Sequence, residues 1–87
     1  MPYTIQFLSS ATRQFTSLTK STQVQLARHI DALQQEPRPQ GAVLLKGENR
    51  LWRLRSGDYR VIYQIDDTAH VVVITKVGHR REIYRDR

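Results

Sequence analysis

The residues best suited to chemistry are basic and gather in the second half of the chain. Eight arginines lie at or beyond position 50, whereas the eight Asp and Glu residues are scattered along the sequence. These arginines are Arg50, Arg53, Arg55, Arg60, Arg80, Arg81, Arg85 and Arg87. A planar guanidinium can bind two oxygens of one phosphate, so a cluster of arginines attracts phosphate backbones and other anions. The net charge of +6 agrees with an anionic partner but does not separate RNA from DNA.

Histidine is the residue type whose ordinary pKa lies closest to neutral pH, so on chemistry alone His79 is the best acid or base in the chain. A lone histidine is also often structural or merely exposed, and both interpretations stay open. His29 and His70 have no cysteine or grouped carboxylate near them in sequence, so we expect no metal site. The sequence also lacks a Gly-rich phosphate loop and a nucleophile elbow, and we expect no cofactor.

The first half of the chain predicts a strand followed by a helical hairpin. Residues 2–7 alternate between apolar and polar side chains, as in a half-buried strand. A short helix is expected over residues 10–18. A longer helix with an apolar stripe should begin at a cap formed by Ser21 or Thr22 and end near Glu36, because two prolines follow.

The second half predicts strands at residues 42–46, 51–55, 59–65 and 71–74. The last of these is a continuous apolar run, which is typical of a central strand covered on both faces. We therefore expect an α+β fold with the layout β-α-α-β-β-β, in which the N-terminal helical hairpin packs on a mainly antiparallel sheet.

Register decides where the arginines point. If Gly57 and Asp58 form a two-residue turn, Arg55 lies opposite Arg60 and successive side chains alternate between the two faces of the sheet. One face then carries Trp52, Leu54, Val61, Tyr63 and Ile65, and the other carries Arg53, Arg55 and Arg60. Like charges directly opposite each other are mildly destabilising, so this second face is easier to understand if it binds an anion. A three-residue turn would split the set.

Size and composition point to one small domain in a reducing compartment. The chain has 87 residues, 39% hydrophobic content and no cysteine, so its stability has to come from packing and hydrogen bonds. Residues 1–7 lack the pattern of a signal peptide, and no apolar run is long enough to span a membrane. We expect a single domain over residues 1–87, located in the cytoplasm.

Two motifs resemble a known family. Residues 51–63 read LWRLRSGDYRVIY and residues 77–84 read VGHRREIY, and together they are similar to the core of RelE-type toxins of the RelE/ParE superfamily. The similarity spans nearly the whole chain. It implies the RelE-like microbial RNase fold and a type II toxin that cuts mRNA in the ribosomal A site without a metal and so inhibits translation. The implied partners are the ribosome, its mRNA and an antitoxin protein.

The resemblance also assigns roles to three side chains. Metal-free RNA cleavage needs a base near the 2′-hydroxyl, positive charge on the phosphorane and a proton source for the departing 5′-oxygen. Arg60 matches a family arginine and would stabilise the transition state, and Arg80 matches a second that would contact phosphate or help the leaving group. Tyr84 corresponds to a C-terminal tyrosine that would orient the 2′-hydroxyl or stack on a base. As alternatives, Arg60 is a surface residue paired with Asp58 or Asp66. Arg80 is then a solvated tail charge and Tyr84 an anchor of the tail.

Four further basic residues fit binding rather than proton transfer. Arg53 and Arg55 match basic family positions around the strand and turn, and we expect them to bind RNA phosphates or ribosomal RNA. Lys46 is a weaker example of the same kind. Arg81 could substitute for Arg80, because the segment between Gly78 and Tyr84 is shorter than in some relatives.

Some features depart from the family pattern. No glutamate here matches the general base of the related YoeB branch, and Glu48 and Glu82 are interpreted as loop and surface charges. The sequence therefore does not identify the general base. The main rival interpretation is the ParE branch of the same superfamily, which binds DNA gyrase and performs no chemistry. A basic RNA-binding domain without activity is the third.

Overall fold

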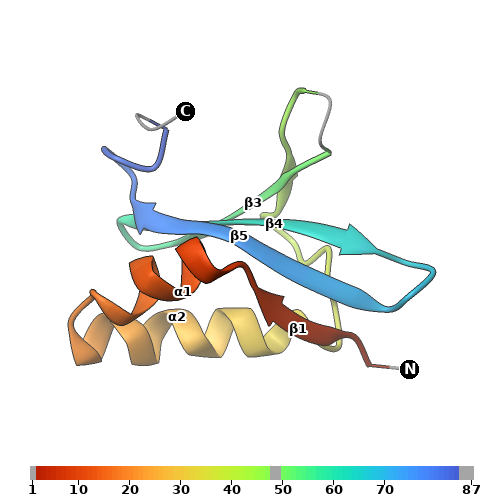
Figure 1. Cartoon of the computed structure of the whole chain (residues 1–87). Helices are drawn as coiled ribbons and strands as arrows, with labels where there is room; N and C mark the ends of the chain where they lie inside the picture. Colours follow the sequence, from red (N-terminus) through yellow and green to blue (C-terminus); the bar gives the residue numbers. More distant parts are fainter. Residues whose placement is uncertain (1, 48–49, 85–87) are drawn as a thin grey trace.

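The computed structural model describes residues 2–47 and 50–84. Its elements are β1 (Thr4–Phe7), α1 (Ser9–Thr16), α2 (Lys20–Ala32), β2 (Val43–Leu44), β3 (Trp52–Ser56), β4 (Tyr59–Asp66) and β5 (Val71–His79). Figure 1 shows both helices on one side of the sheet and the C-terminal tail on the other. Glu48, Arg85 and Arg87 lie outside the described residues.

The five strands form one sheet in the order β1-β5-β4-β3-β2. β1 runs parallel to β5 and the other neighbours are antiparallel, which confirms the expected α+β fold with a mainly antiparallel sheet. All five predicted strands are present, one more than the layout β-α-α-β-β-β counts, and the strand expected at residues 42–46 is shorter than predicted, a two-residue edge strand of Val43 and Leu44 on β3. The apolar run at residues 71–74 is interior, between β1 and β4, while the middle position belongs to β4.

The bounds of α2 differ from the prediction. Its N-cap is Thr19, whose side chain accepts a hydrogen bond from the Thr22 backbone N–H, so the expected cap at Ser21 or Thr22 is wrong. The helix ends at Ala32, short of Glu36, because the N–H groups of residues 33–35 bond to carbonyls three residues back and tighten the chain into a turn. Within residues 2–47 and 50–84, no helix is long and apolar enough to cross a membrane.

The core lies between the helices and one face of the sheet. The β3–β4 register is the predicted one, with Arg55 opposite Arg60 and Leu54 opposite Val61 around a two-residue turn. Leu54 and Val61 are buried together with Leu26 of α2, so the alternate side chains of both strands face away from the helices. The arginine-bearing face is therefore the open face of the sheet.

Tyr63 ties the loop after α2 to the middle of the sheet. Its side chain is fully buried, and its hydroxyl donates a hydrogen bond to the Pro37 carbonyl at 2.8 Å. Burial raises the pKa of Tyr63 to about 12, because the phenolate would lie in a poorly solvated core. The end of the helical hairpin is thus fixed to the strand that carries Arg60.

Candidate functional site

An open pocket of about 450 Å³ lies on the face of the sheet opposite the helices. Its lining residues are Arg53, Arg55, Arg60, Arg80, Arg81 and Tyr84, and we call it the arginine pocket. β3 and β4 supply three of its arginines, and the tail after β5 supplies the rest of the lining. Six of the eight residues that the sequence proposed for the site are therefore brought together.

Arg60 is the most enclosed cation of the pocket. Its side chain is only 9% exposed, and Nη1 donates to the carbonyl oxygens of Gly57 and Tyr59, both at 2.9 Å. Burial, followed by the charges of Arg55 and Arg53, lowers the pKa of Arg60 from its ordinary value. A guanidinium stays protonated in proteins, so the lowered pKa reports burial and an unfavourable positive field, and does not make Arg60 a base.

Among residues 2–47 and 50–84, no acidic side chain forms an ion pair with the arginines from β3 and β4. Arg55 lies directly opposite Arg60, a like-charge pair that costs stability unless an anion screens it. Within the described residues, Arg53 Nε is the buried side-chain donor that has no hydrogen-bond partner. A buried donor without an acceptor costs about 1–3 kcal/mol.

The tail after β5 folds back onto the open face. The Glu82 and Ile83 N–H groups both bond to the His79 carbonyl at 2.9 Å, and the Ile83 side chain is buried to 3% exposure. Ile83 packs over Gly78, where an added Cβ would lie only 3.2 Å from Ile83 Cδ1. Glycine at this position therefore lets the tail approach the sheet and bring Tyr84, which is 48% exposed, to the rim of the arginine pocket.

Arg80 is held at the start of this tail by the β3–β4 turn. Its backbone N–H donates to the Asp58 carbonyl at 2.7 Å, and its Nε lies 3.5 Å from Asp58 Oδ1. The sequence offered Asp58 as an alternative partner of Arg60, whereas the structure pairs it with Arg80. This contact was missed because it joins a turn to a tail that residue spacing alone does not place.

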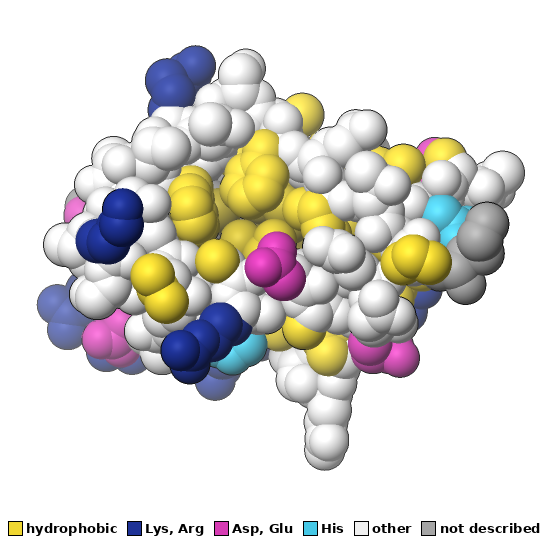
Figure 2. All heavy atoms as spheres, turned by 90° about the horizontal axis from the view of Figure 1, so that it is seen from below, with side chains coloured by type: hydrophobic (Ala, Val, Ile, Leu, Met, Phe, Trp, Pro, Cys, Tyr) yellow, Lys and Arg dark blue, Asp and Glu magenta, His cyan; other side chains and the backbone are white. Residues whose placement is uncertain are grey.

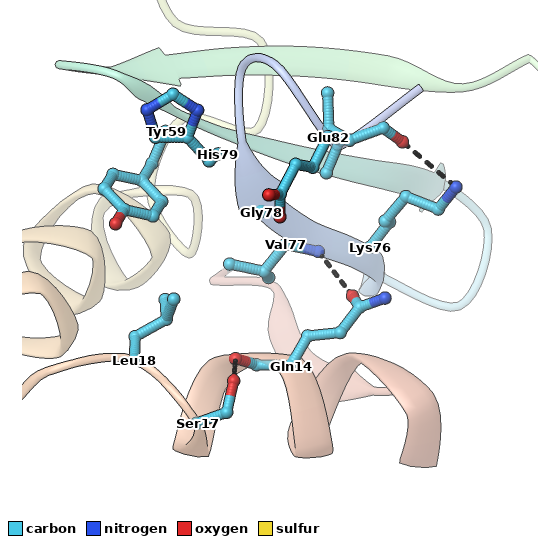
Figure 3. Close-up of a pocket in the computed structure, with 10 residues that line it drawn as sticks. Gln14, Ser17, Leu18, Tyr59, Lys76, Val77, Gly78, His79 and Glu82 are labelled. Carbon is cyan, nitrogen blue, oxygen red and sulfur yellow. Dashed lines mark hydrogen bonds between the residues drawn. The ribbon is translucent and has the colours of Figure 1, made fainter. Parts of the chain in front are cut away.

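His79 faces a different hollow. Figure 3 shows it beside Tyr59 on the side of β5 nearer to α1, among residues that include Gln14, Val77 and Glu82. Its ring meets the Tyr59 ring edge-on at 5.5 Å, and its Nδ1 accepts the Arg81 N–H at 3.1 Å. The structure thus does not place His79 among the residues that line the arginine pocket.

Lys46 also lies apart from the arginine pocket. It is exposed in the loop after β2 and does not line the pocket. Its predicted contact with RNA would therefore be peripheral.

The helical side of the molecule has a different character. Figure 2 shows apolar side chains gathered along the middle of this side, with charged groups of both signs around them. Leu8 and Val24 are about half exposed in the helical layer, and Phe15 and Leu18 are only partly buried. An apolar surface of this kind is a common feature of protein interfaces.

Comparisons with known proteins agree on one family. The family model described as the ParE toxin of the type II toxin-antitoxin system parDE matches residues 3–84. Toxin RelG of Mycobacterium tuberculosis is 35% identical over 86 residues, which cover 98% of this chain and 99% of that protein.

Solved structures share the fold. The toxin-antitoxin complex RelBE2 of Mycobacterium tuberculosis contains a chain that matches with a TM-score of 0.80 and 32% identity, over 92% of this chain and 100% of that one. The archaeal RelE-RelB complex of Pyrococcus horikoshii OT3 gives a TM-score of 0.80 and 30% identity, over 92% and 97% of the two chains.

Proposed function

The chain belongs to the RelE-type toxins of the RelE/ParE superfamily of type II toxin-antitoxin systems, and we propose that it is a metal-independent endoribonuclease that cuts mRNA on the ribosome. The observation that carries this proposal is the arginine pocket, where an unpartnered buried donor and a lowered arginine pKa coincide with a tyrosine hydroxyl. The positive charge of this pocket would attract an anion, and the Tyr84 hydroxyl belongs to a residue of the same lining.

The proposed reaction is an internal transesterification of RNA. The 2′-oxygen attacks the adjacent phosphorus and loses its proton, and the bond from phosphorus to the 5′-oxygen breaks as that oxygen gains a proton. The products are a 2′,3′-cyclic phosphate and a 5′-hydroxyl, and no other reactant is consumed. DNA lacks the 2′-hydroxyl and would not be cut.

The pocket residues divide this work. Arg60 and Arg80 stabilise the charge that develops on the phosphorane, while Arg53 and Arg55 hold flanking phosphates. Tyr84, at the exposed rim, orients the 2′-hydroxyl or stacks on a base. Because an arginine cannot serve as the base at neutral pH, proton removal falls to a group other than the guanidiniums of the pocket.

His79 has a supporting role in this proposal. Its contact with the Arg81 N–H stabilises the turn that leads to Tyr84, and its ring lines the hollow on the α1 side. It therefore shapes the tail instead of exchanging a proton with RNA.

We infer that an antitoxin covers the apolar helical side. The solved relatives include the RelBE2 and RelE-RelB complexes, and the helical layer here exposes Leu8 and Val24 on a chain of net charge +6. An acidic amphipathic segment would complement both features. Co-expression with the neighbouring open reading frame should yield a stable complex and restore growth, and the absence of both would contradict this partner.

The toxin would act in the cytoplasm, where ribosomes present mRNA.

Primer extension on a defined mRNA tests the activity. Purified protein is incubated with the mRNA, with and without programmed ribosomes, beside an Arg60→Ala variant. We expect cuts within the A-site codon that require ribosomes and vanish in the variant. Intact mRNA in every lane would reject the nuclease.

Gyrase inhibition is the second candidate, because the matching family model carries the ParE description. A DNA supercoiling assay with purified gyrase separates the two. Inhibition of supercoiling together with intact mRNA would favour this branch, whereas cleavage with unaffected supercoiling would exclude it.

A further inference from the structure

The β3–β4 turn touches both arginines that the proposed reaction places on the phosphorane. The carbonyls of Gly57 and Tyr59 accept from Arg60 Nη1, and the carbonyl between them, that of Asp58, accepts the Arg80 backbone N–H. The Asp58 carboxylate adds a contact to Arg80 Nε at 3.5 Å. A single tight turn thus fixes the positions of two cations that come from different elements.

The turn is itself well anchored. Gly57 has a φ of 60°, which glycine adopts without strain, as the first residue of a tight hairpin turn requires. Ser56 is buried to 2% exposure, and its hydroxyl accepts a hydrogen bond from Gln25 Nε2 of α2 at 3.0 Å. A Cβ at Gly57 would lie 3.1 Å from the same Gln25 nitrogen, so the turn rests closely on the helix.

The position of the Arg80 side chain depends on Asp58, whereas burial and two carbonyl acceptors hold the Arg60 side chain. The Arg80 side chain is 51% exposed, so little packing restricts its rotamers, and its charge disfavours that of Arg60. Within the described residues, Asp58 is the acidic partner with which Arg80 forms an ion pair. A contact at Nε leaves the Nη donors of the guanidinium for an incoming phosphate.

We propose that Asp58 is a positioning residue, which acts through Arg80 by holding its guanidinium beside Arg60 at the arginine pocket. This role rests on the proposed nuclease function. Exposed ion pairs contribute little to the free energy of unfolding, so the contact between Asp58 and Arg80 acts on the position of the Arg80 guanidinium. Since Asp58 is not among the described residues with positive φ, Ala or Asn can replace it without straining the turn.

Steady-state cleavage of ribosome-bound mRNA provides the first test, with Asp58→Ala, Asp58→Asn and a matched control. Asp66→Ala is the control, because Asp66 caps the turn at residues 68 and 69 in the other hairpin and its loss changes the charge equally. Misplacing a group that must meet the transition state lowers the rate by one to two decades, so we expect kcat of Asp58→Ala to fall roughly tenfold with KM unchanged. Asn keeps an oxygen that can accept from Nε and should restore most of kcat. Wild-type kcat in Asp58→Ala, or an equal loss in the control, would overturn the proposal.

The ¹⁵N–¹H signal of Arg80 Nε provides a readout that does not need cleavage. In the wild type it should be sharp and displaced from the shifts of free arginine side chains, and in Asp58→Ala it should move to those shifts, while Asp58→Asn keeps it in place. An unchanged signal in Asp58→Ala overturns the positioning role. If the wild type cuts no mRNA, the nuclease proposal fails, and this signal still decides whether Asp58 holds Arg80.

Discussion

Arg38 and Arg60 lie in opposite electrostatic surroundings within one small protein. Arg38 donates to both carboxylate oxygens of Asp67, at 3.2 and 2.7 Å, and its guanidinium lies over the Trp52 ring at 5.4 Å. The hydrogen bonds to Asp67, together with the charge of Asp67, raise the pKa of Arg38. Within the described residues, the Arg60 guanidinium donates to neutral carbonyls, and burial beside other arginines lowers its pKa.

The difference separates an arginine with a structural role from the arginine that we propose to be catalytic. The Asp67 carboxylate also accepts the Tyr3 hydroxyl at 2.7 Å, and the Tyr3 ring stacks on His70 at 4.8 Å, so this cluster joins the N-terminus, the loop after α2 and the β4–β5 turn. Its charge is neutralised internally. In the arginine pocket, Asp58 pairs with Arg80, but no ion pair within the described residues neutralises Arg53, Arg55 or Arg60, which costs stability and leaves binding energy for an external anion.

Replacing the functional arginine should give the largest effect. Arg60→Ala removes a donor to the developing phosphorane, so we expect kcat to fall by two to three decades, about 3 kcal/mol of transition-state stabilisation. The free energy of unfolding should stay the same or rise, because a like-charge contact is also removed. Single-turnover cleavage and urea unfolding measure the two quantities.

Arg38→Ala is the matched control for this comparison. It deletes the same side chain from the neutralised cluster and should lower the unfolding free energy while cleavage stays within about twofold of wild type. Equal losses of activity in the two variants would remove the distinction between the two regions.

An anion should stabilise the arginine pocket. Inorganic sulfate at about ten times its dissociation constant should add roughly 1.4 kcal/mol to the unfolding free energy of the wild type, by mass action. Arg53→Ala, which removes the unpartnered buried donor, should lose most of this gain, whereas Arg38→Ala should keep it. Thermal unfolding at constant ionic strength, with chloride as the counterpart salt, distinguishes binding from screening.

Acid pH should act on the Arg38 cluster and produce the smallest effect. The hydrogen bonds from Arg38 and then Tyr3 lower the pKa of Asp67 to about 2. A depressed carboxylate pKa contributes stability that is present above the unfolded value of about 4 and is lost as the pH falls towards 2. Asp67→Asn should therefore unfold a few degrees below wild type at pH 7 and match it near pH 2. A Tm difference that persists unchanged at pH 2 would show that the carboxylate charge is not responsible.

Part of the site follows from the sequence because strand geometry is local. Alternation along β3 and β4, with Gly57 at a two-residue turn, predicted that Arg53, Arg55 and Arg60 share the open face, and the observed register confirms this. The same period placed Leu54 and Val61 in the core. The fold class followed from the order of elements, although the N-cap of α2 and the shortness of β2 did not.

Contacts between distant segments were decided only by the tertiary structure. The pairing of Arg80 with Asp58, the tail packed through Ile83 on Gly78 and the position of His79 toward α1 depend on how the chain turns after β5. The neutralised cluster likewise joins Arg38 to Asp67 across 29 positions and Tyr3 to Asp67 across 64. A strand repeats every two residues and so fixes its own faces, whereas the meeting of two side chains from different elements depends on the packing of the whole chain.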